Sequence, residues 1–373
     1  MRHTHPWTIA GIALACAGTV AATPVLPIAA PTAPSKAASV ALNIELTALD
    51  MVLDLVRHGQ STDNAAGIIG TVPPGASITA LGATQAAFLA DPTNPQHLAN
   101  PSYYDGVYAS EFVRTQQTAA DWLTAAGSPS TPVTVLGGLN EINAGLLDGA
   151  TQTTLNGLLY VLPTLAWVFG QYWVPQIGST IDPNGMAFDN RFTGAVDQIY
   201  ENGGAVGGDG NLHDVAFAHG GSIAAWTMMN VKNPDFGLFL QSLSSGLLPN
   251  TGQVVVEGNP TDGWTLVSWN GTEVAQNPGL LTGLFVDFRD LITAPQMASW
   301  NVWEAIVSGD PSTIPTALFD GLNDVCQAII AFPGAVIDTI LTALGDATGI
   351  GSGVSDIPVD LSDLNALLGP LAI

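Results

Sequence analysis

The chain has 373 residues and carries seven Lys and Arg against 31 Asp and Glu, which gives a formal net charge of −24 at pH 7. This charge argues against a nucleic-acid partner, because binding to nucleic acid depends on Lys and Arg that neutralise phosphates. It argues equally against electrostatic docking on anionic lipid. The length allows two or three structural units, and an apolar fraction of 47% is ample for a buried core.

The N-terminal segment has the features of an export signal. A weakly basic start at Met1–His3 precedes an apolar stretch over Trp7–Val20, and small residues that suit cleavage follow it. We therefore predict a signal peptide over residues 1–22 and an Ala/Pro-rich linker over residues 23–45. The mature protein would be secreted or associated with the cell envelope, and Cys16 leaves lipoprotein processing open as an alternative.

Strand-like runs alternate with helical patterns between residues 46 and 290. This alternation predicts one α/β domain in which helices cover a central sheet. The strand-like runs are Val52–Val56, Asp105–Tyr108, Val133–Leu136, Val215–Ala218, Val254–Val256 and Trp264–Trp269, and the helical patterns are Thr79–Ala90, Ser110–Ala126 and Gly221–Val231.

An uncharged stretch over residues 149–181 lies inside this domain, within an insert that we place at 149–190. The stretch is long enough for a membrane-spanning helix, but Pro163 and Pro175 break it and argue against a span. We favour a helical insert that is buried against the domain. The alternatives are an apolar cap over a site and a surface that faces lipid.

The segment 291–373 forms a hydrophobic C-terminal extension without Lys or Arg. Apolar residues recur at helical spacing on both sides of Pro333, which predicts two amphipathic helices that pack against the body. Asp320, Asp324 and Asp338 interrupt the apolar pattern, so we expect no membrane-spanning segment in the mature chain. Peripheral association with the cell envelope is the alternative.

Four polar motifs follow strand-like runs, at the edge of the sheet where open α/β folds place their chemistry. Planar guanidinium groups match phosphate oxygens, imidazoles can act as nucleophiles or anion ligands, and a carboxyl group can protonate a leaving oxygen. The spacing typical of a metal site is missing, so we predict a phosphate pocket that needs no metal. The motifs are Arg57–Asn64, Ser110–Ala119, Leu139–Gly145 and Ala218–Ser222.

In this order the motifs resemble the histidine phosphatase superfamily, in the branch that includes cofactor-dependent phosphoglycerate mutase (branch 1). The resemblance covers the core alone and implies a three-layer α/β/α sandwich with a mostly parallel central sheet. The apolar insert and the helical C-terminal extension would be additions to that fold. The matching segments are Leu55–Ser61 with Asn64, Ile78–Ala86, Ser110–Ala119, Leu139–Gly149 and Ala218–Ser222.

The resemblance implies a covalent mechanism. His58 would attack phosphorus and become phosphohistidine, which splits one displacement into two easier steps. Neither a metal nor another cofactor would take part. The groups that would hold the phosphoryl oxygens are Arg57, Asn64, Arg114 and His219.

The same resemblance assigns the proton transfers to Glu141, which would protonate the leaving oxygen and then activate water. Asp148 and Glu111 are alternatives for this role. His58, Glu141 and His219 would together form the catalytic set.

The chain departs from the mutases of this family, which place further basic residues near the acid motif to hold a substrate carboxylate. Residues 141–145 contain none, and Arg191 is better explained by pairing with an acid than by contact with substrate. We therefore expect an exported, metal-independent phosphomonoesterase. The apolar insert suggests a small-molecule or lipid-like phosphate ester as its substrate. The alternatives are a mutase-like phosphotransferase and a cell-envelope binding module without turnover.

Overall fold

The computed structural model describes residues 48–204, 207–243 and 247–348. The predicted signal peptide, the predicted linker, Cys16 and the last 25 residues of the predicted extension, 349–373, lie outside these ranges. They stay predictions from the sequence.

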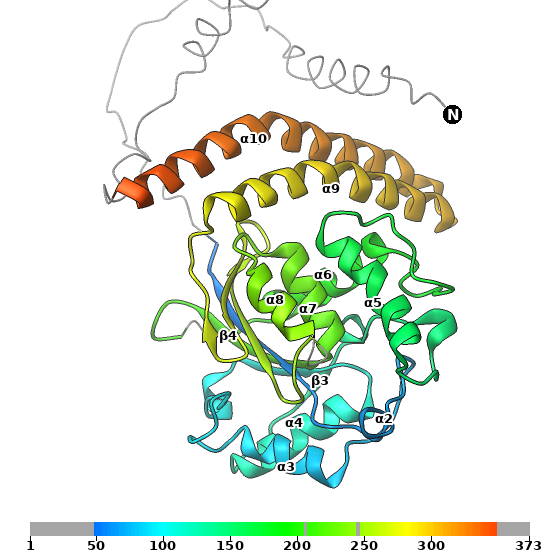
Figure 1. Cartoon of the computed structure of the whole chain (residues 1–373), viewed down its shortest axis with the longest axis vertical. Helices are drawn as coiled ribbons and strands as arrows, with labels where there is room; N and C mark the ends of the chain where they lie inside the picture. The colour runs from blue at the N-terminus through cyan, green and yellow to red at the C-terminus, as the bar shows by residue number, and fades with distance from the viewer. Residues whose placement is uncertain (1–47, 205–206, 244–246, 349–373) are drawn as a thin grey trace, which may run out of the picture.

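A seven-stranded sheet forms the centre of the molecule, in the order β3-β2-β4-β1-β5-β6-β7 (Figure 1). The first four strands in this order are mutually parallel, and β5, β6 and β7 continue the sheet as an antiparallel meander. Five of the seven strands consequently point the same way, which confirms a mostly parallel sheet. The strands are β1 Met51–Arg57, β2 Gly106–Ala109, β3 Thr134–Val135, β4 Leu212–Ala218, β5 Gln253–Asn259, β6 Gly263–Trp269 and β7 Thr272–Glu273.

Helices cover both faces of the sheet, so the predicted three layers are confirmed (Figure 1). On one face, α3 (Ala80–Phe88) and α4 (Val113–Ala125) bury a core that includes Trp122 and Phe217. On the other face, a larger core forms around α6 (Gly185–Glu201) and α7 (Gly220–Asn230). The remaining short helices are α2 Thr62–Ala66, α8 Phe236–Ser242, and the 3₁₀ turns η1 Pro101–Tyr103, η2 Gly137–Leu139, η3 Gly145–Leu147 and η5 Pro311–Thr313.

The central position of α7 follows from its composition. All but two of its residues are buried, and its apolar side chains are spread around the helix instead of along one stripe. A helix of this kind is stable only when other elements cover it on every side. Here the sheet lies beneath α7, and α5 and α6 pack against it (Figure 1).

The insert contains one helix, α5 (Thr154–Val168), which continues into a loop that leads to α6. Pro163 lies inside α5, so the break that we expected at this proline does not occur. The insert is also only partly buried. Trp167 and Val168 are fully buried, whereas Leu155 and Leu162 face solvent. The helix therefore packs on the domain and also presents an apolar outer surface.

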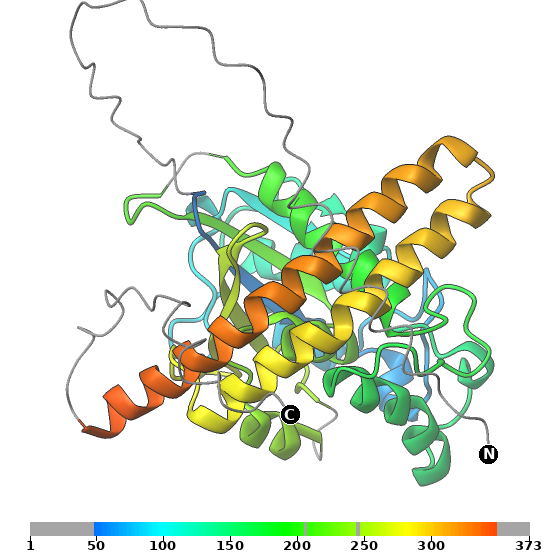
Figure 2. The same ribbon diagram turned by 90° about the horizontal axis from the view of Figure 1, so that it is seen from above.

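Two long antiparallel helices, α9 (Leu280–Val307) and α10 (Ile314–Thr348), lie side by side across the body (Figure 2). Our prediction of two helices separated near Pro333 is wrong, because α10 is continuous through that residue. The apolar positions keep their helical spacing across the proline, so packing against α9 compensates for the hydrogen bond that proline removes. The boundary that we placed between residues 290 and 291 falls within α9.

The helical stretch Pro311–Gly345 is long and apolar enough, by length and composition alone, to cross a membrane. This finding differs from our expectation that Asp320, Asp324 and Asp338 rule such a segment out. The physical reason is that three charges spread over 35 residues leave the rest of the helix strongly apolar. Packing against α9 accounts for part of this apolar surface.

Candidate active site

A cavity of about 980 Å³ lies at the carboxyl ends of β1 and β4. Each of the four polar motifs reaches this place from its own strand end. Arg57, His58, Arg114 and Glu141 line the cavity, together with Gly220 and Gly221 at the start of α7. His219 lies directly before these glycines and is fully buried. The structure therefore brings together the residues that the sequence motifs proposed.

His58 is held with one ring nitrogen turned away from the cavity. Its Nδ1 lies 2.7 Å from the carbonyl oxygen of Gly59. A carbonyl can only accept a hydrogen bond, so Nδ1 carries the proton and Nε2 carries the lone pair. Nε2 in turn accepts a hydrogen bond from Nε of Arg114 at 3.0 Å. The backbone thus selects the tautomer in which Nε2 can act as a nucleophile.

Arg114 connects the two histidines. Besides His58, its guanidinium contacts Nδ1 of His219, with Nη2 at 3.0 Å and Nε at 3.3 Å. The same Nη2 donates to the carbonyl of Gly70 at 3.0 Å, and the guanidinium lies 4.0 Å from the ring centre of Phe112. These contacts fix the guanidinium plane between the two imidazole rings, whose centres are 5.2 Å apart.

A chain of hydroxyl groups orients His219 from behind. Its Nε2 lies 2.8 Å from the Ser110 hydroxyl, which lies 2.9 Å from the hydroxyl of Thr115. Because Nδ1 of His219 accepts from Arg114, Nε2 is the protonated nitrogen and donates to Ser110. Thr115 completes the chain by donating to the carbonyl of Phe112 at 2.8 Å. Ser110 and Thr115 belong to the second sequence motif, where only the arginine had received a role.

Burial and positive charge set the protonation of this cluster. Desolvation lowers the pKa of His58 and of His219 well below the ordinary value of 6.5, and the neighbouring guanidiniums lower both further. Both imidazoles are therefore neutral at neutral pH. Desolvation also lowers the pKa of Arg114 to about 10, with partial opposition from Glu141, so this arginine stays charged.

Two buried guanidinium nitrogens of Arg57 and Arg114 have no hydrogen-bond partner. Arg57 donates from Nη1 to the carbonyl of Leu248, but its Nε is buried and unpartnered. Nη1 of Arg114 is also buried and unpartnered. Buried donors are nearly always satisfied in folded proteins, so two such groups, on the two arginines whose charges act on His58, need an explanation. A tetrahedral oxyanion held between Arg57 and Arg114 would satisfy both donors.

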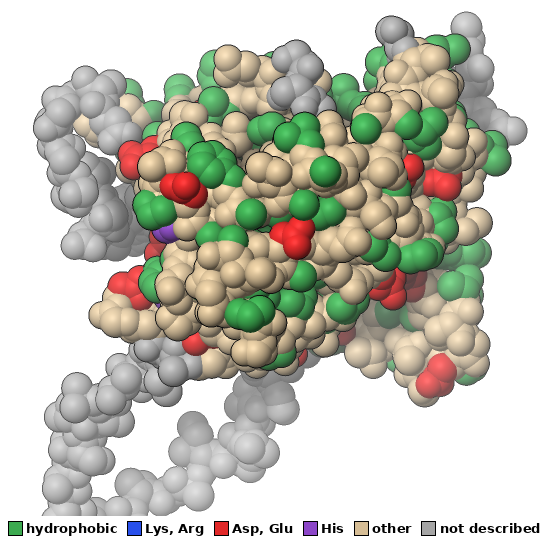
Figure 3. Space-filling view, turned by 90° about the horizontal axis from the view of Figure 1, so that it is seen from below, with side chains coloured by type: hydrophobic (Ala, Val, Ile, Leu, Met, Phe, Trp, Pro, Cys, Tyr) green, Lys and Arg blue, Asp and Glu red, His purple; other side chains and the backbone are tan. Residues whose placement is uncertain are grey.

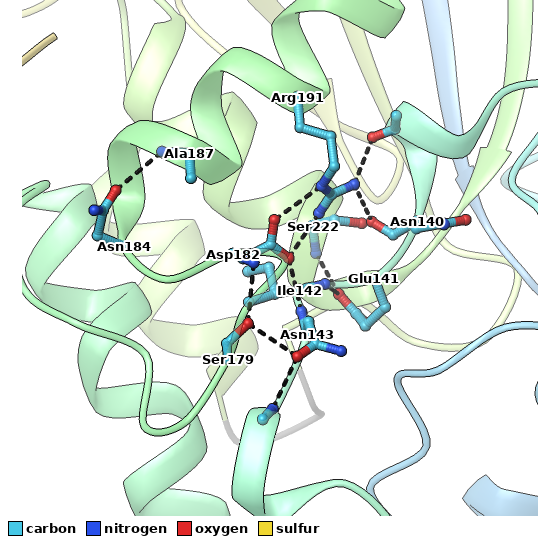
Figure 4. Close-up of polar contacts among 12 residues, drawn as sticks. Asn140, Glu141, Ile142, Asn143, Ser179, Asp182, Asn184, Ala187, Arg191 and Ser222 are labelled. Atoms are coloured by element: carbon cyan, nitrogen blue, oxygen red, sulfur yellow. Dashed lines mark hydrogen bonds and ion pairs between the residues drawn. The ribbon is translucent and has the colours of Figure 1, made fainter. Parts of the chain in front are cut away.

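Glu141 reaches the cavity from the loop after η2 and is held by the start of α7 (Figure 4). Its carboxylate accepts hydrogen bonds from the backbone of Ser222 at 2.8 Å and of Gly221 at 3.2 Å. A side chain at residue 221 would place its Cβ 2.7 Å from the Glu141 carboxylate, which explains the glycine there. The first turn of α7 therefore positions the carboxylate beside the phosphate-binding groups.

The two other acids that we considered for this role lie elsewhere. Asp148 accepts hydrogen bonds from the backbone and hydroxyl of Thr71 at 2.6 Å and 2.8 Å, and it holds that loop in place. Glu111 is exposed and accepts from the amide of Asn140 at 2.7 Å. Neither acid lines the cavity, whereas Glu141 does.

Asn64 lies at the cavity in a helix-capping arrangement. Its Oδ1 accepts from the backbone of Ser61 and from the side-chain amide of Asn250, both at 3.2 Å. This leaves its own amide nitrogen as the atom available to an anion. Asn250 also donates to the carbonyl of His58 at 3.1 Å and lines the cavity, and our reading of the sequence missed it. The only local signal is its place in a Pro-Asn-Thr-Gly turn.

Arg191 has a structural environment of a different kind (Figure 4). Its Nε and Nη2 donate to the two carboxylate oxygens of Asp182 at 2.9 Å and 3.0 Å. Its Nη1 donates to the carbonyls of Gly138 and Asn140 at 2.7 Å and 3.0 Å. The expected pairing with an acid is therefore found, although Asp182 lies in the loop before α6 and not on a helix. Arg191 braces the segment that carries Glu141.

In the part of the chain that the structure describes, no group of three or more His, Cys, Asp or Glu side chains is arranged to hold a metal ion.

Comparisons with known proteins agree with this geometry. Residues 53–272, more than half of the chain, match the model of the histidine phosphatase superfamily (branch 1). A curated relative, the PE-PGRS family protein PE_PGRS11 of Mycobacterium tuberculosis, is 43% identical over 319 residues, which are 84% of this chain and 51% of that protein. This chain thus spans about half the length of that relative.

Several solved structures are similar to parts of the chain. Mycobacterial hydrolase 1 is 22% identical, with a TM-score of 0.43 over 61% of this chain and 100% of that chain. A mycobacterial glucosyl-3-phosphoglycerate phosphatase is 21% identical, with a TM-score of 0.40 over 60% and 99%. A phosphoglycerate mutase from Bacillus anthracis is 17% identical, with a TM-score of 0.42 over 60% and 94%. On the strength of the family match, the chain belongs to branch 1 of the histidine phosphatase superfamily.

Proposed function

We propose that this protein hydrolyses phosphate monoesters, without a metal, through a phosphohistidine intermediate on His58. One observation carries the proposal: the lone-pair nitrogen of a neutral, buried imidazole lies beside two guanidiniums that each have an unpartnered buried donor. These donors match the oxygens of a phosphoryl group, and the imidazole can attack phosphorus once Nε of Arg114 turns its hydrogen bond from Nε2 to a phosphoryl oxygen.

In the first step, Nε2 of His58 attacks phosphorus, an N–P bond forms and the P–O ester bond breaks. The ester oxygen leaves as an alcohol after it takes a proton from the Glu141 carboxyl group. In the second step, the Glu141 carboxylate removes a proton from water, and the resulting hydroxide displaces His58 from phosphorus. Inorganic phosphate leaves, and His58 and Glu141 return to their starting protonation states.

The cationic groups stabilise the charge that moves during both steps. Arg57 and Arg114 would bind the phosphoryl oxygens with donors that are already in place, so little reorganisation is needed in the transition state. Asn64 would add its amide nitrogen. Nδ1 of His219 accepts from Arg114 and Nε2 donates to Ser110, so His219 would donate to a phosphoryl oxygen only after Nδ1 takes up a proton.

Hydrolysis is favoured over transfer between two sites on a substrate. The described residues that line the cavity include two cations, Arg57 and Arg114, and both face His58. A mutase-type substrate would need further cations for its carboxylate.

We also propose that the enzyme acts after export. This proposal rests on the N-terminal sequence. Cleavage between residues 22 and 23 in protein recovered from the culture medium or the envelope would test it.

Release of inorganic phosphate from a panel of esters, with and without a chelator, tests the function. We expect activity that is insensitive to chelator and at least about a thousandfold lower in His58→Ala. His97→Ala, which removes a histidine outside the cavity, should behave like the parent protein. Rapid quenching should trap acid-labile phosphate on His58.

Activity that survives His58→Ala would contradict the mechanism. Exchange of phosphate between substrates without net release would favour the phosphotransferase, and failure to turn over any ester would favour a binding module.

A further inference from the structure

We propose that the substrate is the phosphate monoester of an apolar alcohol that carries no second anionic group, and that α5 selects it. This inference rests on the proposed function and adds the identity of the leaving group. It is carried by the walls of the cavity that the phosphoryl chemistry does not use.

The cavity is much larger than a phosphoryl group requires. Its volume of about 980 Å³ lies at the upper end of the range for small-molecule sites, roughly 300–1,000 Å³. The phosphate-binding groups occupy one end, around His58. The remaining space must therefore accommodate the alcohol part of the ester, and its lining indicates which alcohols fit.

One wall of this space is formed by α5. Leu158, Val161 and Leu165 line the cavity, and their spacing of three and four residues places them on one face of the helix. Tyr160 also lines the cavity, but its hydroxyl is engaged with the carbonyl of Ile142 at 2.8 Å. The wall consequently offers an alcohol apolar surface and few hydrogen-bond partners.

Other apolar residues line the cavity beside its polar ones. Two consecutive isoleucines of the segment after α2 and three apolar residues of the segment after α8 also line the space. An apolar chain that enters this space would be covered on several sides, which favours its transfer from water. The residues are Ile68, Ile69, Leu243, Leu247 and Pro249.

The apolar surface continues from the cavity to the outside of the molecule. Leu158 lies at the mouth and is 54% exposed. Leu155 and Leu162, on the adjoining face of α5, are 65% and 53% exposed. A run of exposed leucines at the rim of a cavity is typical of a site that accepts apolar ligands. An alcohol longer than the cavity could therefore extend along α5.

Charge in the cavity argues against a second anion on the substrate. Asp63 lines the cavity, and its field favours the charged form of Arg114. Among the described residues of the lining, a carboxylate or a second phosphate on the alcohol would meet Asp63 and no cation beyond the two that bind the phosphoryl group. The face of the molecule in Figure 3 likewise displays apolar and acidic side chains, while basic ones are not visible on it.

The experiment compares straight-chain alkyl phosphates, from ethyl to octyl phosphate, with glycerol phosphate and 3-phosphoglycerate. The alkyl esters share one type of leaving group, so differences in kcat/KM report on contacts with the chain. We expect kcat/KM to rise with each added methylene, by up to about fourfold for a fully buried one. Glycerol phosphate should resemble ethyl phosphate, and 3-phosphoglycerate should be the poorest substrate.

Matched leucine variants locate the selectivity. Leu158→Ala should lower the ratio of octyl to ethyl turnover about tenfold. Leu281→Ala removes the same side chain from an exposed position on α9, outside the cavity, and should leave that ratio within about twofold of the parent. Because the ratio is measured within one protein preparation, it does not depend on the fraction that is folded. Asp63→Asn should raise turnover of 3-phosphoglycerate, by about fivefold, but not of octyl phosphate.

A further assay compares a long-chain alkyl phosphate in vesicles of neutral lipid with monomeric octyl phosphate. It shows whether the enzyme takes the alkyl chain from water or from a lipid surface. A preference for longer chains in either form supports the proposal. Phosphate release that is equal for ethyl and octyl phosphate would overturn it and leave the phosphatase mechanism standing. Absence of release from every ester would instead overturn the proposed function.

Discussion

Two regions of the molecule use arginine side chains differently. One is the phosphate-binding cluster of Arg57, His58, Arg114 and His219; the other, called the Arg191 brace, is the set of contacts by which Arg191 holds the segment that carries Glu141. Arg191 makes four hydrogen bonds, two of them to a carboxylate that is fully buried. Arg57 and Arg114 keep a buried donor without a partner, and the described structure places no carboxylate in direct contact with either. Satisfied donors stabilise a fold, whereas donors left unsatisfied are available to a ligand. The two regions should therefore respond to mutation in opposite ways.

The largest effect should come from Arg114→Lys. A lysine keeps the charge but loses the planar arrangement of donors, and we expect kcat to fall at least about a hundredfold. The free energy of unfolding should fall by about 1–2 kcal/mol, because hydrogen bonds of Arg114 to His219 and the Gly70 carbonyl are lost but no buried ion pair is broken. Steady-state kinetics and urea unfolding of the same preparation measure the two quantities. A loss of stability that accounts for the loss of activity would remove the distinction between the two regions.

Asp182→Asn should show the reverse pattern. The substitution leaves the Arg191 guanidinium without its charged partner in a mostly buried position, and we expect a loss of about 3 kcal/mol in stability. Activity of the folded protein should fall less than about tenfold, since Asp182 lies behind the Glu141 segment and outside the cavity. Thermal unfolding together with assays well below the midpoint would check this. Unchanged stability would show that the brace contributes nothing.

Gly221→Ala probes the link between the two regions. The new methyl group would come 2.7 Å from the Glu141 carboxylate, the mobile end of a side chain, so the carboxylate should shift at small cost in stability. A displaced acid should lower kcat about tenfold, since the distance of proton transfer matters. The matched control is Gly194→Ala in α6, where an added Cβ meets nothing within 4 Å. Equal kcat in the two variants would argue against a role for Glu141.

The smallest expected change is in the protonation state of His58 between pH 8 and 6.5. Its pKa in the folded protein lies well below 6.5, so the ring stays neutral throughout this range and protonates only at lower pH. The unfolded chain takes up that proton near pH 6.5, so the contribution of His58 to stability is lost as pH falls below that value. Ring resonances of His58, identified by their absence in His58→Gln, should therefore move little down to pH 6.5. A midpoint at or above 6.5 would contradict the neutral nucleophile.

Much of the fold followed from local patterns. The runs around Val52–Val56 and Val215–Ala218 were predicted as strands because they are short, apolar and bounded by polar loops, and both are central strands. The helix boundaries at Pro163 and Pro333 were wrong for the same local reason. A proline signals a break when only its neighbours are considered, but packing against other elements keeps α5 and α10 continuous.

The candidate site shows the same division. The sequence indicated that Arg114, Glu141 and His219 belong with His58, because each motif follows a strand that ends at one edge of the sheet. It did not indicate Asn250, which reaches the cavity from a turn without a distinctive motif. It also left Glu111 and Asp148 open as acids, since nothing local distinguishes a carboxylate that lines a cavity from one that holds a loop.

By itself the sequence determined the chemical groups of this protein and the order in which strands deliver them. The tertiary structure alone decided which of these groups are satisfied by contacts within the protein and which remain available to bind a ligand. Arg57 finds its carbonyl partner 191 positions away, Arg114 meets the two histidines at separations of 56 and 105 positions, and Arg191 finds Gly138 at 53. Hydrogen-bond partners at such separations depend on how the elements pack, whereas residue type and periodicity are local properties of the chain.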